Sequence, residues 1–103
     1  MKRFICNYIV INTTQHTNSV LCVDNGTFTV QKFDVETPAT LYVEGAIVVA
    51  PASALPGIKA IVTNTASIHE ALENISPLTA FSVQNDNISV FQVTFSPKNV
   101  RLL

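Results

Sequence analysis

Short apolar runs separated by polar turns dominate the chain. The run Arg3–Ile11 alternates imperfectly and ends in consecutive apolar residues, which predicts a strand buried on both faces near its end. A polar connector is predicted over Asn12–Asn18. Two further strands, 19–23 and 27–33, flank Asp24-Asn25-Gly26. Because Asn-Gly accepts positive φ at both central turn positions, these two strands are predicted to form a hairpin.

The middle of the chain carries a longer apolar run over Thr40–Ala50, which follows a break at Thr37-Pro38. This run predicts a long strand with a bulge at Gly45, since glycine inside a strand is typical of bulges. The small-residue stretch 51–57 is predicted to be a connector, and Ile58–Thr63 a short strand.

One helix is predicted at about residues 67–75. Ser67 and Glu70 have the spacing of a capping box, in which the serine hydroxyl binds a free backbone N–H of the first turn. Three apolar side chains then share one helical face, namely Ile68, Leu72 and Ile75. Ser76-Pro77 is expected to end the helix.

The last part of the chain predicts a second hairpin, with strands 79–84 and 88–95 around Asn85-Asp86-Asn87. The chain is therefore expected to be a single mainly β domain over residues 1–103. Its fold is predicted to be a seven-stranded antiparallel β-sandwich or small barrel with one short helix.

Composition supports a β-rich fold and indicates what kind of surface the protein presents. Val, Ile and Thr make up about a third of the 103 residues, and β-branched side chains fit a pleated sheet better than a helix. Charged residues are only 13% and the net charge is −1, so polarity comes from Thr, Asn and Ser. Such a neutral surface is easily desolvated and could lie against another protein. The alternative is a merely polar surface on a monomer.

Basic residues gather near the two ends of the chain, at Lys2, Arg3, Lys98 and Arg101. If the first and last strands are neighbours, these residues form one basic patch that could steer the ends onto another subunit. The alternative is that charged ends simply solvate. We predict no nucleic-acid binding, because that needs many clustered Lys and Arg residues.

The N-terminal run predicts a strand rather than a leader sequence. Its apolar stretch is short and interrupted by Asn7, and no small-residue cleavage site follows. No window approaches the roughly 18 apolar residues of a membrane span. The expected location is therefore a virion if the protein is viral, and otherwise the cytoplasm, without membrane association or secretion by a cleavable signal.

Few residues suggest catalysis or metal binding. Cys6, Cys22, His16 and His69 are the only thiols and imidazoles, and their spacing fits no common zinc site. A Cys22–His16 pair is conceivable as a small nucleophilic site, but it lacks a local signature and an orienting acid. Both cysteines are expected to be small buried apolar residues. We predict no catalytic, metal or cofactor site.

Sheet edges offer a route to assembly. The strands predicted over 40–50 and 88–95 carry few charges, whereas exposed edges are usually protected by Lys, Pro or bulges. Each strand is therefore either central in its sheet or covered by a partner chain through β-augmentation.

No family motif is matched, so function is predicted from these properties alone. We predict a non-enzymatic assembly protein, a small bacteriophage virion component such as a capsid decoration or head–tail accessory protein. It would bind other protein subunits, its own copies included, through neutral β-surface, Leu55 of the 51–57 connector and the basic ends. The alternative is a monomeric binding module or an inhibitor of a host or competitor protein.

Overall fold

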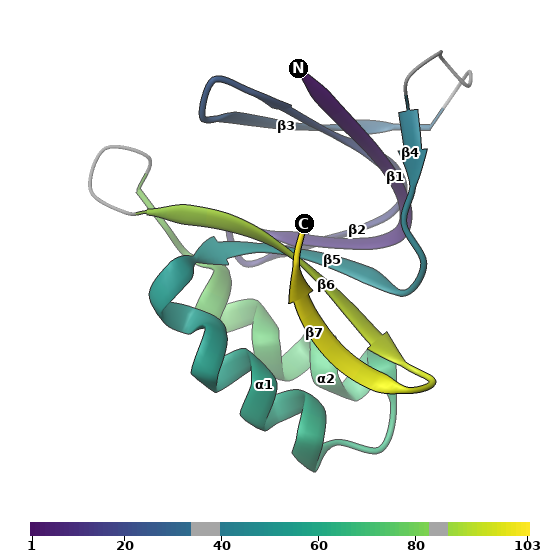
Figure 1. Ribbon diagram of the computed structural model, residues 1–103, viewed down its shortest axis with the longest axis vertical. Coiled ribbons are helices and arrows are strands. Elements are labelled where there is room, and N and C mark those ends of the chain that lie inside the picture. Colours follow the sequence, from purple (N-terminus) through teal and green to yellow (C-terminus); the bar gives the residue numbers. More distant parts are fainter. Residues whose placement is uncertain (34–39, 83–86) are drawn as a thin grey trace.

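A computed structural model describes residues 1–33, 40–82 and 87–103, in which seven strands and two α-helices are present (Figure 1). The strands are β1 (Lys2–Ile11), β2 (Thr14–Asp24), β3 (Thr27–Lys32), β4 (Thr40–Tyr42), β5 (Ala46–Pro51), β6 (Ile88–Phe95) and β7 (Lys98–Leu102). The helices are α1 (Leu55–Asn64) and α2 (Ile68–Ile75), with short 3₁₀ turns at Ala52–Ala54 and Ser76–Thr79. The predicted mainly β fold class is confirmed.

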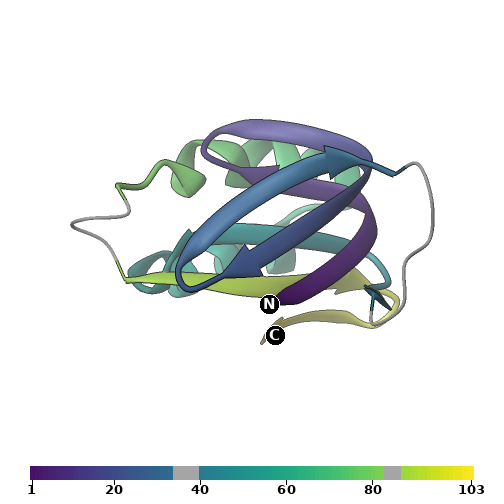
Figure 2. The same ribbon diagram turned by 90° about the horizontal axis from the view of Figure 1, so that it is seen from above.

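All seven strands belong to one sheet of order β3-β2-β1-β5-β6-β7, with β4 also beside β1. Neighbouring strands are antiparallel except that β4 and β5 run parallel to β1, so the sheet is mixed. The sheet coils until the β2–β3 hairpin lies across from β5 and β6, without closing into a barrel (Figures 1 and 2). The two layers expected of a sandwich are thus halves of one curled sheet.

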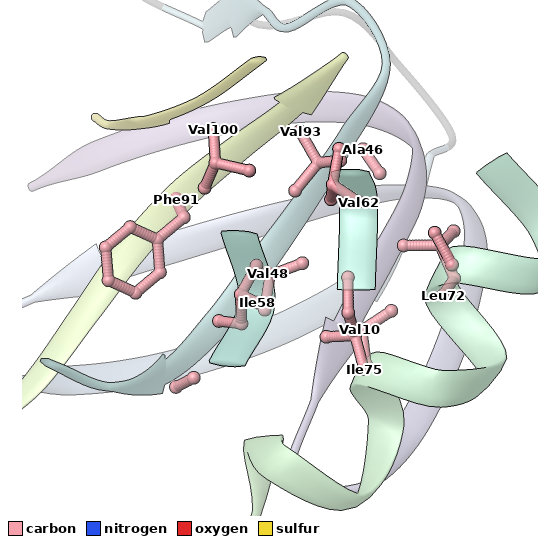
Figure 3. Close-up of a cluster of buried hydrophobic side chains, with 12 residues drawn as sticks. Val10, Ala46, Val48, Ile58, Val62, Leu72, Ile75, Phe91, Val93 and Val100 are labelled. Atoms are coloured by element: carbon pink, nitrogen blue, oxygen red, sulfur yellow. The ribbon is translucent and has the colours of Figure 1, made fainter. Parts of the chain in front are cut away.

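Two apolar clusters hold this arrangement together. The outer cluster lies between the sheet and the two helices, where Val10, Val48 and Phe91 of the sheet meet Ile58 of α1 and Leu72 of α2 (Figure 3). The inner cluster lies inside the curl of the sheet. Its fully buried large side chains are those of Ile9, Leu21, Ile47 and Val49. The helices therefore cover one face of the sheet, and the sheet covers the other face by itself.

Strand β1 contributes to both clusters because it turns over midway. Phe4 and Cys6 face the inner cluster, whereas Tyr8 and Val10 face the helices. Side chains two residues apart share a face in a regular strand, so the faces exchange between Cys6 and Tyr8. The neighbouring residue of β2, Asn18, has a φ of 47°, which marks the same kink on the adjacent strand.

The irregularity predicted at Gly45 is present, but the single strand predicted over Thr40–Ala50 is wrong, because the run forms two strands, β4 and β5, separated by residues 43–45. β4 and β5 run beside β1 as one interrupted strand, in which Tyr42 lies opposite Ile5 and Ala46 opposite Tyr8. Three residues of this strand thus span two residues of β1. Gly45 has a φ of 85°, and a Cβ atom there would collide with the carbonyl oxygen of Val93. Only glycine satisfies both conditions.

The hairpin at Asn25-Gly26 is also confirmed, since both residues have positive φ and join β2 to β3. The connector predicted over Asn12–Asn18 was largely wrong. Only Asn12 and Thr13 form the turn, with φ of 49° and 68°, and β2 already begins at Thr14. A threonine in this conformation is unusual, so such a tight turn could not be predicted from the local residues.

The connector over 51–57 and the strand predicted at Ile58–Thr63 were wrong, because helix α1 runs from Leu55 to Asn64. Pro56 fits the first turn of the helix, where backbone N–H groups have no helical partner. Ile58 and Val62 are buried against the sheet at a spacing of four residues, which is a helical period.

Helix α2 follows the prediction closely. The backbone N–H of Glu70 donates to Ser67 Oγ at 3.2 Å, and the N–H of Ala66 donates to the Glu70 carboxylate at 3.4 Å. Leu72 and Ile75 are buried against the sheet, with Ile68 partly buried beside them. The helix ends at Ile75, directly before Ser76-Pro77.

The second predicted hairpin was wrong in its pairing. Residues 79–82 form a 3₁₀ turn and an irregular segment, and the rest of the 79–84 strand and most of the turn at 85–87 lie outside the described residues. β6 instead forms a hairpin with β7, turning at Ser96-Pro97. β6 is central, between β5 and β7, which is the first of the two alternatives predicted for it.

Candidate protein-docking edge

Strand β3 ends the sheet on one side and presents an open backbone edge. The N–H of Phe33 donates to the carbonyl oxygen of Asn18 at 3.0 Å, which shows which residue pairs of the β2–β3 ladder exchange hydrogen bonds. Odd-numbered residues of β3 therefore bond inward to β2. The N–H and C=O groups of Phe28, Val30 and Lys32 point outward, and we call these groups the β3 edge. No hydrogen-bond partner for this edge occurs among the described residues.

The side chains of β3 divide between its two faces. Phe28 and Val30 pack partly buried against the inner cluster. Thr27, Thr29 and Gln31 lie on the opposite face. All three are uncharged and exposed. Lys32, at the end of the strand, is the one charged residue of β3. Strand β3 thus carries one charge, at its end, and lacks the prolines and bulges that commonly protect exposed strands.

Strand β7 ends the sheet on the other side and is protected. Helix α1 packs alongside it (Figure 1). Lys98 Nζ donates to the carbonyl oxygen of Thr65 at 2.7 Å and so ties β7 to the segment after α1. Arg101 adds a second charge and donates from Nε to Gln92 Oε1. The two ends of the strand order therefore differ, because β7 is flanked by α1 and β3 is not. Among the described residues, the short strand β4 is also paired on one side only, with β1, and exposes Leu41 and Tyr42.

A groove of about 310 Å³ opens where the curled sheet fails to close. Its walls come from the starts of β1 and β3 and from β6 and the end of β7. Phe28 and Val90 line it from the two layers, and Lys2 and the exposed Leu102 line it as well. This groove borders the β3 edge through Phe28.

The four terminal basic residues make different contacts within the chain. β1 and β7 are not neighbours, since β5 and β6 lie between them, so the condition for the predicted patch is not met. Lys2 lines the groove, Arg3 lies opposite Cys22 on β2, Lys98 reaches the segment after α1, and Arg101 binds Gln92.

Leu55 lies at the start of α1 rather than in a connector. Its half-buried side chain packs against the outer cluster. It therefore contributes to the attachment of the helix to the sheet.

The thiols and His16 do not form a nucleophilic pair. His16 and Cys22 lie six residues apart on β2, which separates them by roughly 20 Å along the strand. Both cysteines are free and buried, as predicted. Burial raises the pKa of the Cys6 thiol, although backbone N–H groups nearby act in the opposite direction. This thiol donates to the Gly45 carbonyl oxygen at 3.4 Å.

His69 instead meets Tyr8. The Tyr8 hydroxyl and His69 Nε2 lie 3.5 Å apart, and the two rings pack edge to face with centroids 5.1 Å apart. This contact attaches α2 to β1. Within residues 1–33, 40–82 and 87–103, no three His, Cys, Asp or Glu side chains are placed so that they could hold a metal ion.

The β3 edge was not predicted from the sequence. Open edges were predicted only for the strands over 40–50 and 88–95. The available signal was the alternation of residues 27–32 with one charge at the end, directly after an Asn-Gly turn. That signal identifies a half-buried strand but not its place in the sheet.

No family model, curated protein or solved structure matches the chain. None of the helices in the described part of the chain has the length and apolar character needed to cross a membrane.

Proposed function

We propose that this protein is a non-enzymatic assembly component that docks onto another protein chain by adding a strand to its β3 edge. The observation that carries the proposal is the outward-facing backbone of Phe28, Val30 and Lys32, which has no partner among the described residues. Strand addition satisfies such groups with a regular ladder of main-chain hydrogen bonds.

The contrast between the two ends of the sheet supports this proposal. β7 carries two charged side chains and is flanked by α1, whereas β3 carries one charge and has its neutral Thr29 at its centre. An unprotected edge tends to aggregate unless a partner covers it. We therefore infer that a partner covers β3 in the working state of the protein.

The setting we propose is a virion, with the protein acting as a capsid decoration or head–tail accessory subunit. A chain of 103 residues with 13% charged residues presents a surface that another subunit can desolvate at little electrostatic cost. Subunits of a particle are also held at high local concentration, which allows a short edge contact to contribute to binding.

A test compares Thr29→Lys with Asn74→Lys in the source of the protein. Thr29 points away from the inner cluster, and its backbone bonds inward, so lysine there places a charge beside the β3 edge without breaking the fold. Asn74 is exposed on α2 and supplies the same charge change elsewhere.

Quantitative mass spectrometry of purified particles gives the outcome. We expect wild type and Asn74→Lys to be present at equal copy number and Thr29→Lys to be reduced at least tenfold. Particles that lack the wild-type protein would contradict the virion setting. Equal incorporation of all three proteins would contradict docking through β3.

A second candidate function is that of a monomeric binding module or inhibitor. The groove beside the β3 edge favours it, because apolar walls formed by Phe28 and Val90 can receive side chains of an extended foreign segment. This candidate predicts a monomer in solution at all concentrations and a single protein target outside any particle.

A further inference from the structure

The β3 edge is suited to a second copy of the same chain. Resting on the proposed function, which leaves the partner open, we propose that two molecules pair their β3 strands antiparallel about a two-fold axis that passes beside Thr29. The two curled sheets would then continue into each other across the axis.

Symmetry restricts the possible registers. A two-fold axis that relates adjacent antiparallel strands is perpendicular to the sheet, so each residue pairs with one that faces the same side. Even-numbered residues of β3 face the inner cluster, so the axis must pass beside an individual residue rather than between two residues. Thr29 and Val30 are the residues nearest the centre of the strand.

The register centred on Thr29 pairs suitable side chains. Phe28 of each molecule lies opposite Val30 of the other, which is an aromatic and β-branched pair, and the two Thr29 side chains meet at the axis. The outward N–H and C=O groups of Phe28 and Val30 lie opposite each other and can exchange hydrogen bonds. The register centred on Val30 would instead place Lys32 opposite Phe28, which removes the aromatic and β-branched pair.

Cross-linking tests the register. In the proposed pairing, the two Thr29 residues form a non-hydrogen-bonded pair with Cα atoms about 4.5 Å apart, a distance that a disulfide can span. Thr29→Cys in a Cys22→Ser background should therefore form a covalent dimer on mild oxidation; the background is needed because Cys22 lies directly opposite Thr29 on β2 and would compete for the new thiol. Thr27→Cys is the control, because the two copies of residue 27 would lie about 13 Å apart. Cys6 and Cys22 are buried, so wild type should not cross-link.

A charge exchange tests the dimer itself by light scattering on a sizing column over a hundredfold concentration range. Wild type should dimerise as concentration rises, whereas Thr29→Lys and Thr29→Glu alone should remain monomeric because like charges meet at the axis. An equimolar mixture of the two variants should restore the dimer. Because mixing restores it, a loss in each variant alone cannot arise from misfolding.

The outcomes separate this proposal from the proposed function. A wild type that stays monomeric overturns the second copy as partner, as does a cross-link in Thr27→Cys equal to that in Thr29→Cys. If Thr29→Lys is then still lost from particles, the β3 edge docks onto a different subunit and the proposed function stands. If Thr29→Lys behaves as wild type in both experiments, both proposals fail.

Discussion

Thr79 holds the turn of the β1–β2 hairpin by accepting a hydrogen bond from the backbone N–H of Thr13 at 2.7 Å. The same hydroxyl donates to the carbonyl oxygen of Ser76 at 2.7 Å, and Ser76 Oγ donates to the carbonyl oxygen of Thr13 at 2.8 Å. Both backbone groups of Thr13 are therefore bound by the 3₁₀ turn after α2. This network explains how a β-branched residue is kept at a φ of 68°.

Replacing Thr79 by valine should destabilise the protein by about 1–3 kcal/mol, because both hydrogen bonds of the Thr79 hydroxyl, from the Thr13 N–H and to the Ser76 carbonyl oxygen, would be lost. Thr79 is fully buried, so valine preserves most of the packing and isolates the hydrogen bonds. Urea denaturation measures the free energy of unfolding. Thr63→Val is the control, since the Thr63 hydroxyl bonds only to Lys59 O on the exposed side of α1. A loss no larger than in this control would show that the network contributes little.

Hairpin and helix signals were readable from sequence wherever the residues at the turn or cap determine the local backbone. The Asn25-Gly26 turn, the Gly45 bulge and the Ser67 cap are such cases, and each lies where it was predicted. The Asn12-Thr13 turn was not readable, because its conformation depends on hydrogen bonds from residues more than sixty positions away.

Helix α1 shows how tertiary contacts override local preference. Ile58 and Val62 are β-branched and favour strands in isolation. Their burial against Val48 and Phe91 selects the helix instead, because a spacing of four residues places both side chains on one helical face. Burial of a large apolar side chain contributes about 1.5–3 kcal/mol, which exceeds the helix-propensity difference of a few tenths.

Alanine in place of Gly45 should be far more costly than alanine in place of Gly26. Both glycines have positive φ, so either substitution places an L-residue in the left-handed region at a cost of about 1–2 kcal/mol. At Gly26 the new methyl group meets open space, whereas at Gly45 it collides with the Val93 carbonyl oxygen. We expect about 3 kcal/mol or more for Gly45→Ala. Equal thermal unfolding midpoints for the two variants would contradict the close approach of β5 and β6.

The place of β3 at the end of the sheet could not be predicted, because strand order depends on long-range pairing. β1 is followed in sequence by β2 and β3, yet its other side is covered by β4 and β5 after residue 39. The sequence of residues 27–32 is equally compatible with a central strand. The candidate site is therefore a property of topology, whereas its neutral composition was visible in the sequence.

Stability should fall at alkaline pH partly through Cys6. Burial raises the pKa of this thiol above its ordinary value of 9.0, so the folded protein retains the proton at a pH where the unfolded chain releases it. Its contribution is complete below about pH 9 and decreases as pH rises toward the pKa in the folded state. Wild type should lose more free energy of unfolding between about pH 7 and pH 10 than Cys6→Ala. Both proteins share every Tyr and Lys, so the titration of those groups cancels in the comparison.

Lys98 was predicted to contact a partner, whereas in the structure it contacts its own chain. A substitution at Lys98 can distinguish these two roles. Its ammonium group donates to the carbonyl oxygen of Thr65 at 2.7 Å and lies 5.4 Å from the centre of the Phe95 ring. Lys98→Met keeps an apolar stem but removes these two interactions and the longer hydrogen bond to the Thr63 carbonyl oxygen at 3.4 Å, so the free energy of unfolding should fall by about 1 kcal/mol. Lys59→Met is the control, because Lys59 is exposed on α1.

Copy number in purified particles gives the second readout for the same two variants. If Lys98 acts only in folding, both variants should be incorporated as wild type at a temperature where both are folded. Reduced incorporation of Lys98→Met alone, with stability unchanged, would show that a partner contacts Lys98 directly. In that case β7, rather than the β3 edge, would be the end of the sheet that docks.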